Sequence, residues 1–229
     1  MKNNISDSAK VYNPVTLKIY DWWVLSVSNR FAWRCETSKH LLPHYMQHVR
    51  QKHLDIGVGT GFYLPVIPKE YSISLLDLNE ASLNAASRRV GSQRITKKIQ
   101  HDVFQSFPDV LHKQYDSISM FYLLHCLPGV MEQKSPVIKN AAEALTDGGI
   151  LFGATILGKG VQHNMFGRKL MQLYNKKGIF SNTLDSEESL AKILSDHFNT
   201  INIKTEGMVA LFSARNKKIN SQASYQIKT

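Results

Sequence analysis

Short apolar runs alternate with amphipathic stretches along most of this chain. One apolar run ends in Asp55, and others of strand length cover residues 71–76, 95–100, 115–121 and 150–157. Asn79 and Ser135 each begin a helical pattern with apolar residues at three- and four-residue steps, and Gly91 ends the first of these patterns. Strands that alternate with helices in this way predict an α/β fold with a mostly parallel sheet covered on both faces.

The pattern changes near the end of the chain. Residues 198–205 and 208–214 are two β-rich runs, and only Glu206 and Gly207 separate them. Such a short connection cannot contain a helical crossover, so the two runs predict an antiparallel hairpin. A purely parallel dinucleotide-binding sheet gives no reason to expect this hairpin. The residues that follow, 216–229, are polar and predict a frayed tail.

The N-terminal part predicts an amphipathic helix. Asn13 is suited to cap it, Pro14 takes its first position, and apolar residues continue at helical spacing to Phe31. Three tryptophans accompany this helix, namely Trp22, Trp23 and Trp33. Two interpretations are compatible: the helix packs on the sheet or in a dimer interface, or it forms a lid over a ligand.

A glycine-rich loop follows the first strand. Gly57, Gly59 and Gly61 stand at alternate positions after Asp55, where glycine allows a sharp turn and close approach of a ligand to the backbone. The dinucleotide fingerprint G-x-G-x-x-G has its third glycine one residue later. An acid before the loop would repel a pyrophosphate, but it suits a cationic amino-acid headgroup. The spacing therefore favours a nucleoside that carries such a headgroup.

Two further acids follow strands at similar intervals. Asp77 comes after the second strand, twenty positions past Gly57, where a carboxylate can bind both ribose hydroxyls, and Asp102 comes after the third. One such acid alone is well explained as a helix N-cap, but three in register indicate a ligand site. The motif D-x-G-x-G-x-G at 55–61, with these acids and the terminal hairpin, resembles the class I S-adenosylmethionine-dependent methyltransferases over residues 10 to 215.

The resemblance implies a Rossmann-like sheet of seven strands in the order 3-2-1-4-5-7-6, with strand seven antiparallel. It implies an enzyme that uses S-adenosylmethionine, releases S-adenosylhomocysteine and methylates a small natural-product or lipid-like molecule. In that family the acid at the position of Asp102 accepts a hydrogen bond from the adenine amino group, and the residue at the position of Val103 supplies backbone contacts. The residue at the position of Tyr20 closes over the ligand. The implied cofactor-binding residues are Tyr20, Asp55, Gly57, Gly59, Gly61, Asp77, Leu78, Asp102, Val103 and Phe121.

Two histidines are candidate catalytic bases. His125 follows the fourth strand at the edge where open α/β sheets bind ligands, and a histidine titrates near neutrality. The alternative is that His125 packs behind the site. His163 lies between the fifth strand and the hairpin, where Phe166, Leu170, Leu173 and Tyr174 predict one helical face. The expected substrate pocket, suited to an apolar or aromatic acceptor, comprises Tyr12, Trp23, Tyr122, His125, Met165 and Phe166.

Length and composition limit the expected domain organisation, location and binding partners. The 229 residues suit one globular unit, which we divide into a helical cap (1–45), a cofactor-binding domain (46–215) and a tail (216–229). No stretch reaches the roughly 20 apolar residues of a membrane span, and no signal peptide is evident, so we expect a cytoplasmic protein. The two cysteines and nine histidines form no metal-binding pattern. The net charge of +10 comes from scattered residues, which favours a solvated surface over nucleic-acid or anionic-lipid binding.

The motifs of several other methyltransferase classes are missing. The sequence after the fourth strand, Phe-Tyr-Leu-Leu at 121–124, differs from the N/D-P-P-Y/F motif of amino-methylating nucleic-acid enzymes, and Cys126 lacks the preceding proline of cytosine-carbon enzymes. The double-glutamate loop of protein-arginine methyltransferases is missing as well. An inactive scaffold that binds a partner through its aromatic helix, or an NAD-linked oxidoreductase, remains as an alternative.

Overall fold

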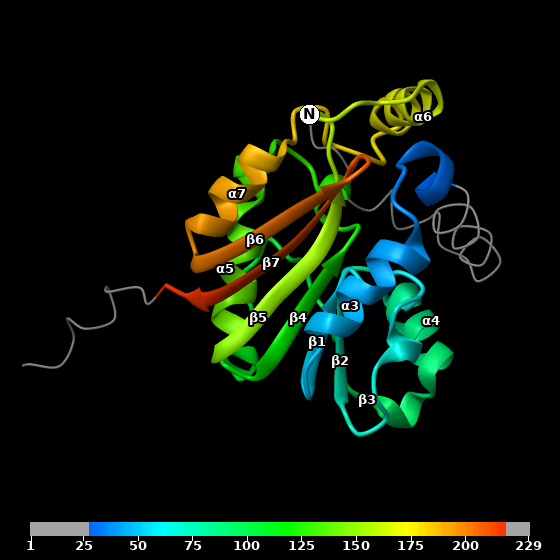
Figure 1. Ribbon diagram of the computed structural model, residues 1–229. Helices are drawn as coiled ribbons and strands as arrows, with labels where there is room; N and C mark the ends of the chain where they lie inside the picture. Colours follow the sequence, from blue (N-terminus) through cyan, green and yellow to red (C-terminus); the bar gives the residue numbers. More distant parts are fainter. Residues whose placement is uncertain (1–27, 219–229) are drawn as a thin grey trace, which may run out of the picture.

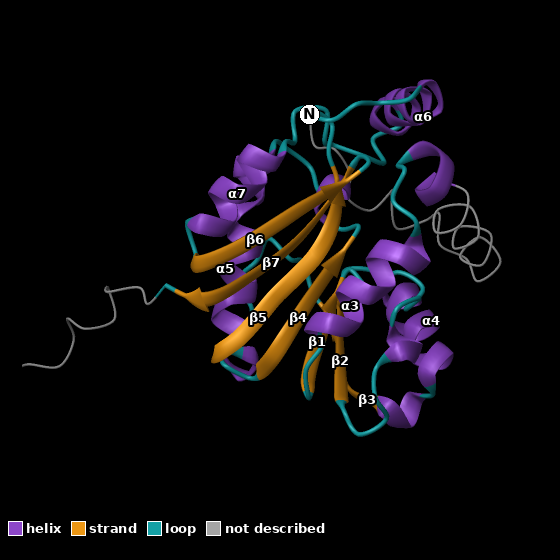
Figure 2. Ribbon diagram, viewed as in Figure 1, coloured by secondary structure: helices purple, strands orange, loops and turns teal. Residues whose placement is uncertain are grey.

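The computed structural model describes residues 28–218, which form one seven-stranded sheet with helices on both faces (Figures 1 and 2). The strand order is β3-β2-β1-β4-β5-β7-β6, and β7 runs antiparallel to both of its neighbours. This order and direction confirm the predicted fold. The strands are β1 (Lys52–Ile56), β2 (Ser72–Asp77), β3 (Ile95–Gln100), β4 (Tyr115–Phe121), β5 (Leu145–Ile156), β6 (Phe198–Glu206) and β7 (Val209–Lys217).

The strands agree closely with the apolar runs of the sequence. β3 and β4 have the predicted bounds, and β6 and β7 form the predicted hairpin. β5 begins at Leu145, five residues before the predicted start, because Leu145 already pairs with Tyr115. The register then shifts, so that Ser117 pairs with Ile150. The Thr-Asp-Gly-Gly sequence at 146–149, predicted as a turn before the strand, is therefore an irregularity within it.

The helices are α3 (Leu42–His48), α4 (Glu80–Val90), α5 (Ser135–Ala144), α6 (Met165–Lys176) and α7 (Glu187–Ser195). The Asn79 side chain caps α4 by accepting a hydrogen bond from the Ala81 amide at 2.9 Å, as the sequence predicts. Helix α7 was not predicted, although Ser186 caps it through the Ser189 amide at 3.1 Å. Short 3-10 turns connect several of the other elements, and a π-helical turn (Thr37–Leu41) precedes α3.

Two apolar cores cover the two faces of the sheet. One contains residues of α5 and α7, such as Val137 and Leu190. The other contains residues of α3, α4 and α6, and it includes Trp33 from the segment before α3. Trp33 is 1% exposed, and its carbonyl accepts a hydrogen bond from the Met208 amide. The described part of the predicted cap thus shares a core with the sheet, while residues 13–27 of the predicted N-terminal helix lie outside the described residues.

Candidate functional site

The glycine turn lies directly after β1, at the carboxyl edge of the sheet. Gly57, Gly59 and Gly61 have φ values of +69°, +50° and +68°, a backbone region that favours glycine. The Gly57 amide donates to the Leu76 carbonyl of β2 at 2.8 Å, which fixes the start of the turn. A Cβ built on Gly59 would meet nothing within 4 Å, so the turn presents bare backbone to open space at this point.

The neighbouring Gly61 faces protein instead. A Cβ there would lie 2.8 Å from the backbone Cα of Ala86 in α4, so this glycine is needed for packing. Alanine at either position also has to adopt a left-handed conformation, which costs about 1–2 kcal/mol. Gly59, which is open, and Gly61, which is packed, therefore give a matched pair of variants.

We expect Gly59→Ala to keep the protein folded and to weaken nucleoside binding on the order of tenfold or more, because the added methyl group fills the open space above the turn. Gly61→Ala should instead lower the unfolding temperature, because the backbone of α4 has to move. Thermal unfolding with and without S-adenosylhomocysteine separates the two effects. Equal loss of stability in both variants, with binding retained in Gly59→Ala, would contradict this assignment.

Asp77 ends β2 beside the glycine turn. One carboxylate oxygen accepts the Gly59 amide at 3.4 Å, and the other accepts the Asn79 amide at 2.8 Å. Burial raises the pKa of this carboxyl, and the surrounding amides oppose that shift. Asp77 therefore links the turn to the start of α4 and stands where the sequence predicts a ribose-binding acid.

Asp55 lies on the sheet beneath the turn and is 6% exposed. Its carboxylate accepts a hydrogen bond from the Ser119 hydroxyl at 2.5 Å, and that hydroxyl lies 3.1 Å from His53 Nε2. The Tyr45 hydroxyl lies 2.9 Å from the same nitrogen. Burial raises the pKa of Asp55 to about 7, and burial lowers that of His53 to about 3. The site thus holds a carboxylate without a cationic partner among these contacts.

The third acid, Asp102, occupies a turn after β3. Its carboxylate accepts the Phe104 amide at 3.0 Å. The next residue, Val103, is 7% exposed, and its carbonyl accepts a hydrogen bond from the Asn140 side chain of α5 at 2.9 Å. Asn140 also bonds the Gln105 carbonyl at 2.8 Å, so α5 fixes the shape of this turn. Sequence reasoning did not find Asn140, because its partners lie 35 and 37 residues away.

Two predicted site residues, Phe121 and Tyr122, lie at the end of β4 and have different surroundings. The Phe121 ring packs among Tyr45, Tyr63 and Phe152, with ring centroids 4.6 to 5.9 Å apart, so it belongs to the apolar core. Tyr122 has a φ of +58°, unusual for a residue with a side chain. Its hydroxyl donates to the Asn29 side chain at 2.8 Å. Leu78, after β2, is 42% exposed at the site edge.

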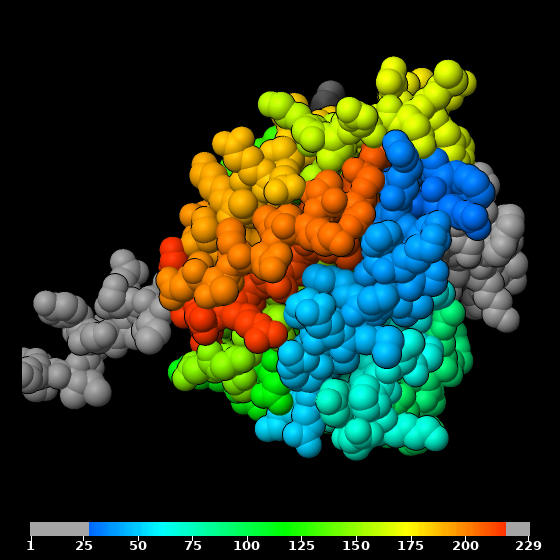
Figure 3. Space-filling view, viewed as in Figure 1, coloured from blue at the N-terminus to red at the C-terminus, as the bar shows by residue number. Residues whose placement is uncertain are grey.

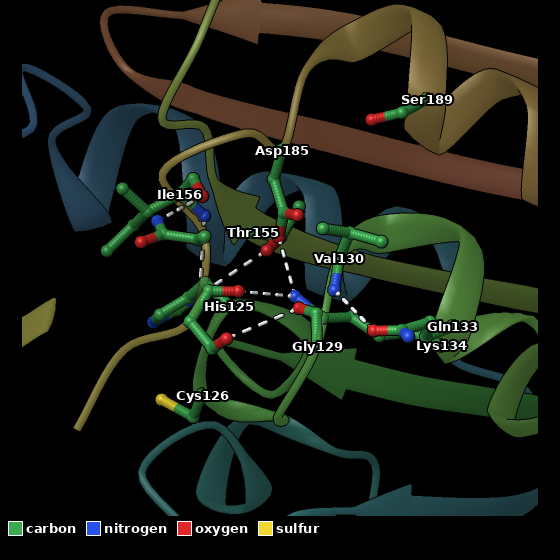
Figure 4. A network of polar contacts seen from close by, with 12 residues as sticks. His125, Cys126, Gly129, Val130, Gln133, Lys134, Thr155, Ile156, Asp185 and Ser189 are labelled. Carbon is green, nitrogen blue, oxygen red and sulfur yellow. Dashed lines mark hydrogen bonds and ion pairs between the residues drawn. The ribbon is translucent and has the colours of Figure 1, made fainter. Parts of the chain in front are cut away.

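His125 is 2% exposed and lies behind the end of β5 (Figure 4). The Ile156 amide donates to its Nδ1 at 3.3 Å, so the hydrogen of the neutral ring lies on Nε2. Burial, and then the charge of Lys134, lowers the pKa of His125 to about 3. A ring with this pKa is a weak base near neutrality, so these contacts favour the alternative in which His125 packs behind the site.

A buried ion pair lies beside His125, and the sequence did not predict it. Lys134 Nζ lies 2.7 Å from the Asp185 carboxylate, both side chains are almost fully buried, and Lys134 also donates to the Ser181 carbonyl at 2.9 Å (Figure 4). The Asp185 carbonyl accepts the Gly158 amide, and the Ser181 amide donates to the His125 carbonyl. The pair therefore joins the loops that follow β4 and β5. The 51-residue separation leaves no local pattern to predict it.

His163 lies next to a hollow of about 580 Å³ at the start of α6. Its Nε2 lies 3.1 Å from the Gly158 carbonyl, and its Nδ1 is buried with no hydrogen-bond partner among residues 28–218. The hollow is lined by Gly158, Val161, Gln162, His163, Arg168, Met171 and Gln172. His125 and His163 are thus on the loops after adjacent strands, and no contact between them is recorded among the described residues.

The predicted face of α6 lies on a helix but is only partly buried. Leu170 is buried as expected, but Gly167 and Met171 accompany it, whereas Phe166 and Leu173 are 37% and 42% exposed. The cause is a close approach: a Cβ on Gly167 would lie 2.7 Å from the Ala32 carbonyl. Met165, predicted in the substrate pocket, is 74% exposed. Tyr12, Tyr20 and Trp23 lie outside the described residues.

Several known proteins are similar in sequence to this chain. A family model described as a methyltransferase domain matches residues 54–151. The uncharacterized protein YbcY of Escherichia coli (strain K12) is 63% identical over 194 residues, which cover 85% of this chain and 100% of YbcY. The physcion biosynthesis cluster O-methyltransferase of Aspergillus chevalieri is 39% identical over 211 residues, 91% of this chain and 95% of that protein.

A solved structure shares the fold. The N-methyltransferase NodS from Bradyrhizobium japonicum WM9, in complex with S-adenosylhomocysteine, has a TM-score of 0.56 at 16% sequence identity. The match covers 77% of this chain and 84% of that one.

Proposed function

Because this chain belongs to the class I S-adenosylmethionine-dependent methyltransferase family and is therefore a methyltransferase, we propose that it methylates a hydroxyl oxygen of a small apolar molecule. Its S-adenosylmethionine lies against the glycine turn, with Asp77 on the ribose, Asp102 near the adenine and Asp55 near the cationic amino group. The observation that carries this proposal is Asp77, whose half-buried carboxylate adjoins the open backbone of Gly59.

The residues of the turn fit this cofactor. Bare backbone at Gly59 leaves room for a nucleoside, and Asp55 is a buried carboxyl whose pKa is raised by burial. S-adenosylmethionine supplies a methyl group bonded to a positively charged sulfur, and this sulfur is a good leaving group. The protein then has to bind and align the acceptor and keep water away from it. The Lys134–Asp185 pair supports that alignment, because it holds the loops after β4 and β5.

Oxygen is the proposed acceptor atom because relatives that span nearly the whole chain carry the name O-methyltransferase. The hollow beside His163 has the size of a small-molecule pocket and contains Val161 and Met171 as apolar walls. His163 is the proposed proton acceptor, since its Nε2 hydrogen is committed to Gly158 and its Nδ1 retains a lone pair. For the buried Nδ1 to act, the acceptor has to displace the atoms that cover it.

The proposal is tested by incubating the protein with methyl-labelled S-adenosylmethionine and a panel of apolar phenols, each beside its own methyl ether. We expect label in the phenols and none in the matched ethers, which lack a free hydroxyl, and we expect much less label in the phenols with the Asp77→Asn variant at a limiting concentration of S-adenosylmethionine. Label found only in protein or nucleic acid would contradict a small-molecule acceptor.

Some predictions from the sequence go untested by these contacts. The division into cap, domain and tail, the cytoplasmic location and a homodimer stay predictions, as does the scaffold alternative. β7 extends to Lys217, two residues past the predicted end of the domain. Within residues 28–218, no helix has the length and apolarity needed to cross a membrane.

A further inference from the structure

Helix α6 exposes apolar side chains beside its buried residues. Met165, Leu173 and Phe166 are 74%, 42% and 37% exposed. Because four residues make just over one helical turn, Met165, Lys169 and Leu173 follow one another along one side. Lys169 and Lys176 are exposed on that side as well. An exposed stripe that mixes large apolar side chains with lysines is unusual on a surface that meets only water.

A second segment extends this surface. Phe31 is 58% exposed, and the Arg30 guanidinium lies 5.5 Å from the centre of its ring. The Asn164 side chain, which caps α6, donates to the Phe31 carbonyl at 2.7 Å, so the segment and the helix touch. Figure 3 shows the two regions side by side, α6 in yellow and the segment in blue. We name the residues Arg30, Phe31, Met165, Phe166, Lys169, Leu173 and Lys176 the basic apolar face.

The sequence around α6 carries basic residues and no acidic ones. Residues 148–184 contain no aspartate or glutamate, although the chain has 18 of them, and they contain five basic residues: Lys159, Arg168, Lys169, Lys176 and Lys177. All five are exposed. In the sequence these residues look scattered, and the fold brings Arg30 to the same surface. Positive charge without acids beside it attracts an anionic partner over the range of the Debye length.

We infer that the basic apolar face docks on an anionic phospholipid membrane. A helix that carries apolar residues with lysines between them can lie in the headgroup layer, with the apolar side chains inserted and the lysines near lipid phosphates. Phe31 and Phe166 are aromatic and suit either lipid or bases, but the aliphatic side chains of Met165 and Leu173 offer no stacking platform for nucleic-acid bases and suit insertion into lipid. The hollow beside His163 is partly formed by the same helix, through Arg168 and Met171. The inference concerns binding and does not depend on the proposed acceptor.

The test is co-sedimentation of the full chain with vesicles of phosphatidylcholine alone or of phosphatidylcholine mixed with phosphatidylserine. We expect wild-type protein to sediment with the anionic vesicles and to stay in solution with the neutral ones. Lys169→Glu with Lys176→Glu should weaken binding roughly tenfold or more. Met165→Ser with Leu173→Ser should also weaken it, because the inserted side chains are lost.

A matched control separates the face from net charge. Lys69 and Lys192 are exposed elsewhere, so Lys69→Glu with Lys192→Glu makes the same charge change away from α6. This control should bind anionic vesicles like wild type, and all variants should bind S-adenosylhomocysteine like wild type. The inference is overturned if wild-type protein does not bind anionic vesicles, or if the control loses as much vesicle affinity as the α6 variants. It is also overturned if the protein binds duplex DNA instead of vesicles and only the lysine-to-glutamate variant of α6 weakens that DNA binding.

Discussion

Replacing Asp77 by asparagine is expected to weaken S-adenosylhomocysteine binding on the order of a hundredfold while the protein stays folded. Each hydrogen bond between a carboxylate and a ribose hydroxyl contributes about 1.5–3 kcal/mol, and an amide replaces two charged acceptors by one neutral acceptor and a donor. The remaining oxygen can still accept the Asn79 amide, which preserves the start of α4. Isothermal titration of the product into wild-type and variant protein measures the difference.

The matched control is Asp109→Asn, which removes the same charge from a fully exposed side chain. We expect it to bind S-adenosylhomocysteine like wild type, so a loss confined to Asp77→Asn would come from the site. If Asp77→Asn binds as tightly as wild type while circular dichroism shows both to be folded, Asp77 does not hold the ribose.

Asp55 is expected to couple cofactor binding to proton release. Its pKa in the free protein is raised to about 7, and a cationic amino group beside it favours the ionised form, so its pKa falls on binding. Affinity for S-adenosylmethionine should therefore rise with pH up to about 7 and then level off. Titrations near pH 6 in buffers of different protonation enthalpy should reveal release of a large fraction of one proton.

Asp55→Asn tests the origin of that proton. The variant keeps an oxygen for the Ser119 hydroxyl but has no carboxyl to ionise. It should release no proton on binding and should bind on the order of tenfold more weakly above neutrality. Proton release that persists in this variant would assign the linkage to another group, and an unchanged affinity would remove Asp55 from the cofactor contacts.

The same carboxyl also affects stability without ligand. Because its folded pKa lies above the ordinary value of 3.8, burial favours the protonated form. Its contribution to stability is complete below that ordinary value and is lost as the pH rises through about 7. Above that pH the free protein thus holds the ionised acid at a cost to its stability.

The fold was accessible from the sequence because its signals are local. The apolar runs of β3 and β4 and the Glu206-Gly207 turn each act within a few residues, and together they fix the antiparallel end of the sheet. Helix α7 was missed although its start carries a local signal, since Ser186 caps it and Glu187 and Glu188 lie in its first turn. The start of β5 was misplaced because the pairing of Leu145 with Tyr115 depends on a neighbouring strand.

The arrangement of the candidate site could be predicted only where acids follow strands. Asp55, Asp77 and the glycines were found because each ends a strand or forms the turn after it. The burial of His125 was not predictable, since it depends on the Ile156 amide and on Lys134 and Asp185, which come from distant segments. The outward orientation of Phe166 follows from the contact of Gly167 with Ala32, again a property of the fold.

The most direct test of the account is a crystal structure of the protein with S-adenosylhomocysteine. The account predicts electron density for the nucleoside over Gly59, with both ribose hydroxyls within hydrogen-bond distance of Asp77 and the amino group near Asp55. Density for the ligand elsewhere, with Asp77 still bonded only to the amides of Gly59 and Asn79, would contradict it.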